Sequence, residues 1–336
     1  MHSKGTVLIN GVAGFLGSHL ADSLLERGYR VVGVDNLSHG SLENIRDAQQ
    51  NDDFEFHQID VCDMDALRAV SEGVTAIAHM AAYKIPRYGK AIDTLLINEL
   101  GCHNALELAV ERKAKFVLAS TSDVYGKNAQ IPFSEESDLV LGPSTVARWS
   151  YAVSKLFDEH LTLAYADSYG IDVSIVRIFG SYGPRQNLTW WGGPQSVFIG
   201  AILNDEEIPI HGDGKQTRSF TYVSDTVGGI VSVLENGASG EIFNIGNNQE
   251  ITIVELAQLI HRLSATEKPL RLKFIPYDEI GGRRYEDVRR RVPDTTKACE
   301  KLGFKAQVSV EEGLKRTIEW QRRICEAQAV AAGQSR

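Results

Sequence analysis

The sequence contains little that would indicate a secreted, metal-binding or membrane-spanning protein. Its four cysteines lie far apart, with no C-x-x-C pair and no histidine at the spacing of a zinc site. No charged segment leads into a hydrophobic stretch with a small-residue cleavage site, and no run of about 18 apolar residues occurs. We therefore expect a cytoplasmic protein with reduced thiols, no bound metal, no signal peptide and no membrane-spanning segment.

Positive charge is outnumbered by negative charge, with 35 lysines and arginines against 44 aspartates and glutamates. The formal net charge is −9 at pH 7, which argues against a protein that holds nucleic acid by an overall positive field. A ligand with phosphate groups must therefore bind at a site where positive or N–H groups are gathered locally. Hydrophobic residues, by contrast, make up 43% of the 336 residues. That is enough for one large α/β domain with a smaller appended lobe.

Short β-branched segments alternate with segments of helical periodicity through the first half of the chain. The expected strands are 6–10, 30–35, 54–58, 75–79, 115–120 and 172–178, and the expected helices include 16–27, 97–112 and 151–169. This alternation predicts an α/β fold, namely a Rossmann-type doubly wound parallel sheet whose ligands lie at the carboxyl ends of the strands.

After the last of these strands the alternation stops, and glycine, proline and tryptophan become frequent. We therefore expect a cofactor-binding domain over residues 1–180, to which the chain returns near 223–246. Residues 181–325 are expected to form mainly a smaller, discontinuous C-terminal lobe that binds substrate. Residues 326–336 show no core-forming period and are expected to form a flexible tail.

A glycine-rich turn links the first expected strand to the first expected helix. It reads Gly11-Val-Ala-Gly14-Phe15-Leu16-Gly17. Glycines permit a tight turn and a close approach of the backbone to a pyrophosphate, and a helix N-terminus supplies N–H groups and the positive end of a dipole. The motif predicts a dinucleotide site formed by these residues, and its G-x-x-G-x-x-G spacing resembles that of the short-chain dehydrogenases.

Asp35 ends the second expected strand and supplies an independent signal for the same site. A carboxylate at this position can accept hydrogen bonds from the ribose hydroxyls of adenosine. It would repel a 2′-phosphate, and Asn36-Leu37 offers no arginine to compensate. We therefore expect NAD rather than NADP, bound by Asp35 and Asn36.

Tyr151 and Lys155 lie about one turn apart in an expected helix, so they share one face. The positive charges of the lysine and of a bound nicotinamide both favour phenolate, so Tyr151 can accept a hydroxyl proton while hydride leaves. The strand 115–120 runs into further hydroxyl side chains, and Thr121 can hydrogen-bond the reacting oxygen. Thr121, Tyr151 and Lys155 form the expected catalytic centre.

The glycine turn, Asp35 and this centre, in this order, resemble the extended short-chain dehydrogenases of the NAD-dependent epimerase/dehydratase family over nearly the whole chain. The resemblance implies an enzyme that oxidises the 4-hydroxyl of a nucleotide-linked sugar to a 4-keto intermediate and reduces it again. It implies further cofactor contacts at Asp60, Val61, Ala81, Ala82 and Asn98, and substrate contacts at Arg87, Arg185, Gln195, Arg218 and Arg291. It also implies a homodimer formed through the helices 97–112 and 151–169.

One position departs from the pattern of the family. Family members commonly have an asparagine after Arg-x-Phe, whereas this chain has Gly180. A substrate-orienting amide is therefore missing, and the pose of the substrate cannot be carried over at this point.

The resemblance leaves the reaction of the oxidised sugar open. A 4-keto sugar can be reduced to the 4-epimer, lose a 6-carboxylate or undergo dehydration. Ser122-Asp123 resembles the Ser-Glu pair of glucuronate decarboxylases and of some dehydratases, Arg148-Trp149 resembles a bacterial glucuronate decarboxylase, and Lys84 could meet a carboxylate.

Other segments resemble family members described as epimerases, namely the Gly-Gly-Pro-Gln-Ser loop 192–196 and the Arg-Arg-Val-Pro-Asp segment 290–294. We therefore place a UDP-sugar 4-epimerase first. The alternative is a UDP-glucuronate decarboxylase or a 4,6-dehydratase that uses Ser122 and Asp123. An alternative of another class is a non-catalytic sensor of NAD or nucleotide sugars.

Overall fold

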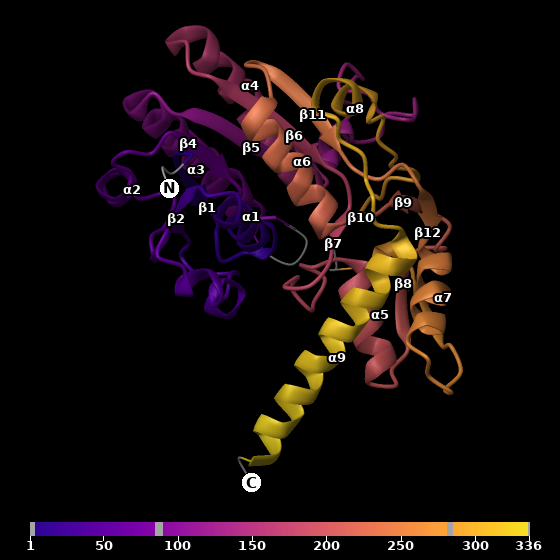
Figure 1. Cartoon of the computed structure of the whole chain (residues 1–336). Helices are drawn as coiled ribbons and strands as arrows, with labels where there is room; N and C mark the ends of the chain where they lie inside the picture. Colours follow the sequence, from indigo (N-terminus) through magenta and orange to yellow (C-terminus); the bar gives the residue numbers. More distant parts are fainter. Residues whose placement is uncertain (1–3, 85–89, 281–284, 335–336) are drawn as a thin grey trace.

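The computed structural model describes residues 4–84, 90–280 and 285–334, and the first lobe is built on a seven-stranded sheet (Figure 1). Neighbouring strands pair in parallel in the order β11-β6-β5-β4-β1-β2-β3. The strands are β1 (Thr6–Asn10), β2 (Arg30–Val34), β3 (Phe54–His57), β4 (Ala76–His79), β5 (Lys115–Thr121), β6 (Val173–Ile178) and β11 (Glu241–Ile245). The Rossmann-type sheet predicted from the sequence is confirmed.

Helices cover both faces of this sheet. Val7 and Ile9 of β1 pack into one core with α1 (Phe15–Glu26) and α6 (Val223–Asn236). Leu8, which points to the other face, packs with α2 (Met64–Val70), α3 (Ala91–Arg112) and α4 (Trp149–Tyr169). A strand buried on both faces needs a continuous apolar run, and this explains the sequence of β1.

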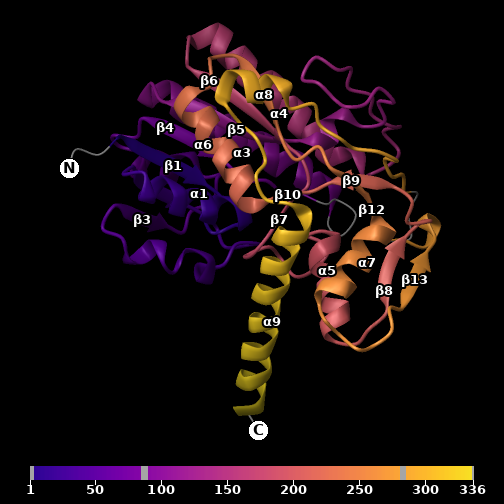
Figure 2. The ribbon, with the colours of Figure 1, turned by 45° about the vertical axis from the view of Figure 1, so that its right-hand side comes forward.

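The second lobe is built from short paired strands and helices (Figure 2). Its elements are β7 (Ser181–Tyr182), α5 (Pro194–Leu203), β8 (Ile208–His211), β9 (Thr217–Ser219), β10 (Thr221–Tyr222), β12 (Glu250–Thr252), α7 (Ile253–Leu263) and β13 (Leu272–Ile275). Between the strands of this lobe, the chain returns to the first sheet in α6 and β11.

Short 3-10 helices occur in both halves of the chain. They are η1 (Leu42–Ile45), η2 (Ala48–Gln50), η3 (Ser122–Tyr125) and η4 (Tyr277–Glu279).

The last two helices correct one expectation. The chain ends in α8 (Thr296–Leu302) and α9 (Val310–Gln334), and α9 projects away from the rest of the molecule (Figures 1 and 2). Residues 326–334 are therefore helical, where the sequence predicted a flexible tail. This stretch contains four alanines and two glutamines, which favour a helix without any core-facing pattern. None of the described helices is long and apolar enough to cross a membrane.

Candidate active site

A cleft of about 1220 Å³ lies between the lobes, at the carboxyl ends of the strands of the large sheet. Ligands bind at this edge in open α/β sheets. The predicted site residues in its wall are Gly11, Gly14, Phe15, Leu16, Gly17, Asp35, Asn36, Asp60, Val61, Ala81, Ala82, Asn98, Thr121, Ser122, Asp123, Tyr151, Arg185, Gln195, Arg218 and Arg291. Lys155 lies behind this wall, and Arg87 lies outside the described residues.

The glycine turn has the shape that a dinucleotide requires. Gly11 has φ of +83°, and a Cβ atom on Gly17 would lie 2.1 Å from the carbonyl oxygen of Gly11. No side chain caps the start of α1, so its first N–H groups remain available to a pyrophosphate. The turn therefore fits NAD, because only glycine allows the backbone to fold this tightly against the start of α1.

Asp35 lies at the end of β2, on the rim of this turn. Its carboxylate accepts hydrogen bonds from the backbone N–H groups of Ala13 (3.0 Å) and Leu37 (2.8 Å), and burial raises its pKa. Asn36 donates to Asp60 Oδ2 at 2.8 Å, so the ends of β2 and β3 are joined. The predicted adenosine-binding residues thus form one connected edge of the cleft.

Tyr151, the predicted general base, lies at the start of α4, next to the end of β5. Thr121, the last residue of β5, hydrogen-bonds Tyr151, and the Thr121 hydroxyl also accepts from the N–H of Asp123 at 3.2 Å. Burial raises the pKa of Tyr151 to about 12, while the nearby Lys155 ammonium opposes this rise. The phenol is therefore protonated at neutral pH, and further positive charge is needed to make it a base.

Lys155 is held by an acid that the sequence analysis did not identify. Its Nζ lies 3.0 Å from Asp158 Oδ2, and both side chains are almost completely buried. An acid three residues after a lysine on one helix face is the only signal that the sequence offers for this pair.

Asn98 on α3 hydrogen-bonds two other segments of the chain. Its amide accepts from the N–H of Tyr83 at 2.6 Å and donates to the Ser154 hydroxyl at 2.9 Å. It therefore ties the loop after β4 to α4. With its amide engaged in this way, Asn98 supports the cofactor side of the cleft through the loop that it holds.

A cluster of five charged residues faces the cleft near Tyr151. Arg291 Nη2 donates to Asp123 at 2.6 Å and Arg218 Nη2 to Asp287 at 2.7 Å, while Arg148 Nη2 lies 3.3 Å from Asp287 and 3.6 Å from Asp123. Asp287 was missed by sequence reasoning, because nothing in its sequence context links it to residues on β9 and α4.

The arginines set the charge of both acids. Burial raises the pKa of Asp123, but the guanidinium groups of Arg291, Arg148 and Arg218 outweigh this effect, so that its pKa lies below the ordinary value. The same balance lowers the pKa of Asp287 to about 2. Both acids are therefore carboxylates at neutral pH.

Three other predicted contacts differ in their surroundings. Arg185 pairs with Asp22 of α1 at 2.6 Å, so its charge is already partly engaged. Gln195 is buried in the cleft wall, and its Nε2 has no partner among the described residues, as expected of a group that awaits a ligand. Lys84 also lines the cleft, where it lies within reach of the charge of Asp123.

Gly180 has a structural explanation. Its φ is +50°, and a Cβ atom there would lie 2.2 Å from the carbonyl oxygen of Ser219. An asparagine would therefore require β9 to move. The close approach of β9 to the end of β6 therefore explains why this position has glycine.

The chain is similar to known nucleotide-sugar enzymes over nearly its whole length. A family model described as GDP-mannose 4,6 dehydratase matches residues 8–317. A UDP-N-acetyl-α-D-glucosaminuronate decarboxylase of Bacillus cytotoxicus is 38% identical over 323 residues, covering 96% of this chain and 99% of that protein. UDP-glucuronic acid decarboxylase 4 of Arabidopsis thaliana is 37% identical over 310 residues, covering 92% of this chain and 66% of that protein.

A solved structure shows the same arrangement of both lobes. The UDP-glucuronic acid 4-epimerase of Bacillus cereus, in complex with UDP-glucuronic acid and NAD, superposes with a TM-score of 0.84 at 29% identity. The superposition covers 95% of this chain and 99% of that one.

Proposed function

Since the chain belongs to the NAD-dependent epimerase/dehydratase family of extended short-chain dehydrogenases, we propose that it decarboxylates a UDP-linked sugar acid. Its similarity to two decarboxylases across most of its length supports this choice. It reverses the order of preference from the sequence, which placed a 4-epimerase first. The family and the use of NAD are common to both reactions.

The observation that carries the proposal is the charge of the five-residue cluster near Tyr151. Arg148, Arg218 and Arg291 bring three positive charges, and the carboxylates paired with them among the described residues are Asp123 and Asp287. A surplus of positive charge remains. A UDP-linked sugar acid carries a diphosphate and a carboxylate, and arginine binds both groups through paired N–H donors.

The redox half of the reaction uses the residues behind and beside this cluster. NAD, when bound, supplies the hydride acceptor for carbon 4 of the sugar and later returns the hydride. Tyr151 accepts the proton of the 4-hydroxyl, Thr121 hydrogen-bonds the same oxygen, and Lys155 stabilises the phenolate by its charge. The product of this half-reaction is a 4-keto sugar acid.

Decarboxylation then results from the chemistry of that ketone. The bond between carbons 5 and 6 breaks, carbon dioxide leaves, and the electron pair moves through carbon 5 to the 4-oxygen as an enolate. Carbon 5 then takes up a proton. Arg291 lies against both Asp123 and Ser122, so its positive charge is placed beside the residues that come directly after Thr121.

The ionisation of Asp123 argues against dehydration. Loss of the 6-hydroxyl as water needs a protonated acid at that oxygen. Although burial raises the pKa of Asp123, the surrounding guanidinium groups bring it below its ordinary value, so its side chain is a poor proton donor at neutral pH. Decarboxylation does not require an acid at the leaving group.

A panel of sugar nucleotides incubated with the enzyme and NAD, read by mass spectrometry, tests the proposal. The expected result is that a UDP-linked sugar acid loses the mass of carbon dioxide. A new isomer of unchanged mass would support the 4-epimerase, which the similarity to the Bacillus cereus structure favours as a second candidate. Loss of the mass of water would point to a dehydratase.

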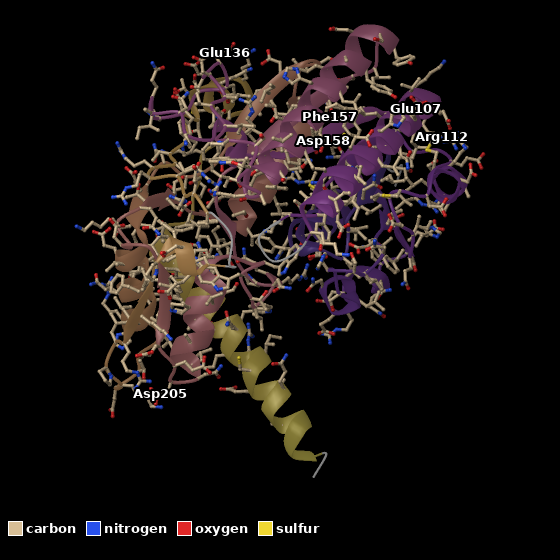
Figure 3. The ribbon with its side chains drawn as sticks, turned by 180° about the vertical axis from the view of Figure 1, so that it is seen from behind. Glu107, Arg112, Glu136, Phe157, Asp158 and Asp205 are labelled. Atoms are coloured by element: carbon tan, nitrogen blue, oxygen red, sulfur yellow. The ribbon has the colours of Figure 1, made fainter. Side chains whose placement is uncertain are left out.

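We also propose that two copies of the chain associate through α3 and α4. Figure 3 shows these helices on one face of the molecule, with Phe157 labelled on α4. Their exposed apolar side chains are Ile92, Leu95, Leu96, Leu100, Val153, Phe157 and Tyr169. This is a much larger apolar surface than scattered single residues would give.

The association predicts a specific effect of Phe157→Asp. Burying a charge in the contact should weaken the dimer by about 2 kcal/mol or more, because such apolar anchors dominate interfaces. Light scattering coupled to size exclusion should then detect monomers. Phe274 is similarly exposed on β13, so Phe274→Asp serves as the matched control. A parent protein that is already monomeric would contradict the proposal.

A further inference from the structure

The pair formed by Lys155 and Asp158 is the most deeply buried ion pair that includes a catalytic residue. Its nitrogen and oxygen are 3.0 Å apart, with side chains 1% and 0% exposed. Asp158 lies on the inner face of α4, next to the outward-facing Phe157 (Figure 3). The second carboxylate oxygen, Oδ1, has no hydrogen-bond partner among the described residues.

Such a pair adds little to stability. Two charges removed from water cost about as much as their attraction returns, and a well-packed apolar pair of the same volume is often as stable. The unpartnered Oδ1 adds to this cost. The benefit of the acid must therefore be sought in its effect on the lysine.

We propose that Asp158 is a positioning residue for catalysis, the counter-ion that keeps the buried Lys155 charged and fixes its ammonium behind Tyr151. A lysine ammonium has three N–H donors. One of them is given to Asp158, so two remain for the phenol and for the ribose of the cofactor. The inference rests on the proposed redox roles of Tyr151 and Lys155, but not on the reaction that the oxidised sugar then undergoes.

Among the ionisable groups around Lys155, Asp158 is the main source of negative charge. From β4, His79 is neutral, because burial lowers its pKa to about 3. From α3, burial raises the pKa of Cys102, so it is a neutral thiol, and Glu99 acts at longer range.

The remaining neighbours lie on α4 and β6. The Glu159 carboxylate pairs with Arg177 at 2.7 Å, so its charge is neutralised locally. Burial lowers the pKa of Lys155, but Asp158 opposes this most strongly and, together with Cys102 and Tyr151, brings the net pKa above the ordinary value. The negative charge of Asp158 also contributes to the raised pKa of Tyr151.

Because the charge of Asp158 raises the pKa of both Lys155 and Tyr151, its removal should shift the pH profile of turnover. Loss of one negative charge lowers the pKa of each ionisable neighbour. In Asp158→Asn, the acid limb, which reports phenol ionisation, and the alkaline limb, which reports loss of the lysine proton, should therefore both move to lower pH. We expect turnover at the optimum to fall about tenfold, because the lysine loses its fixed position.

The experiment records pH profiles of turnover for the holoenzyme on any sugar nucleotide that the parent transforms. Asp158→Glu, which keeps the charge, should restore the position of both limbs. Asp167→Asn, an exposed acid on the same helix, is the matched control and should leave the profile in place. If turnover of Asp158→Asn falls at every pH but the acid and alkaline limbs stay at the same pH as in the parent, the proposal is overturned.

A stability measurement gives a second test that needs no activity and does not depend on Asp158→Asn folding. Lys155→Met leaves the Asp158 carboxylate buried without its partner, so the melting temperature should fall. Lys155→Met combined with Asp158→Asn should recover part of that loss. If the double variant is no more stable than Lys155→Met alone, the acid carries no charge that the lysine balances, and the proposal fails. If the parent transforms no sugar acid while this coupling holds, only the proposed function fails.

Discussion

Replacing Tyr151 with phenylalanine should lower turnover about 10³-fold, within the range for loss of a general base. The change removes one oxygen and keeps the ring. Burial has raised the pKa of Tyr151 to about 12 in this structure, so the phenol depends on Lys155 and on a bound cofactor to become a base. Without its hydroxyl, no other group at this position can accept the proton of the sugar 4-hydroxyl.

Two further measurements make this result specific. NAD binding, followed by calorimetry, should be nearly unchanged in Tyr151→Phe, because the glycine turn and Asp35 remain in place. Tyr169→Phe, at the exposed end of the same helix, is the matched control and should keep full turnover. Turnover that survives in Tyr151→Phe would remove this residue from the chemistry and require another base in the cleft.

The parts of the molecule that the sequence predicted well depend on local pattern. The glycine turn and Asp35 each come after a strand whose apolar run is readable from neighbouring residues, and strand ends converge at one edge of a parallel sheet. The same logic places Thr121 beside Tyr151. Each of these residues lines one cleft, although their individual roles stay predictions.

Pairings between distant segments could not be predicted in this way. Asp287 meets Arg218 and Arg148 only because the chain after β13 crosses back over the cleft. The effect of Gly180 depends likewise on the carbonyl of Ser219 approaching from another strand. No pattern in the sequence signals either contact, so the charge balance near Tyr151 can be seen only in the folded structure.

That charge balance also surrounds the place where the candidate reactions differ. A 4-epimerase can act on a sugar acid too, as the Bacillus cereus enzyme shows, but it leaves the carboxylate in place while the 4-keto ring turns over, whereas a decarboxylase must hold the carboxylate and let its carbon leave. The arrangement of Arg291 against Asp123 suits the second task, since the substrate carboxylate meets one positive and one negative group in the same place. Asp123 is therefore the residue at which the two proposals predict different results.

Asp123→Asn should lower turnover roughly several hundredfold if the enzyme is a decarboxylase, as expected when a fixed charge beside the reacting centre is lost. The substitution keeps the shape of the side chain but removes the charge that holds Arg291 at 2.6 Å. Arg291 is then free to pair with the substrate carboxylate, which stabilises the group that must leave as carbon dioxide. Steady-state assays of carbon dioxide release measure the loss, with circular dichroism to establish that the fold is unchanged.

The control for this variant is Asp213→Asn, which removes an exposed carboxylate paired with Arg289 and should have little effect on turnover. In a 4-epimerase, Asp123 would only order the turn after β5 by its contact with Arg291, and Asp123→Asn would remain largely active. A folded and active Asp123→Asn protein that yields an isomer of unchanged mass would therefore exclude decarboxylation, because the charge on which that reaction depends would have no role.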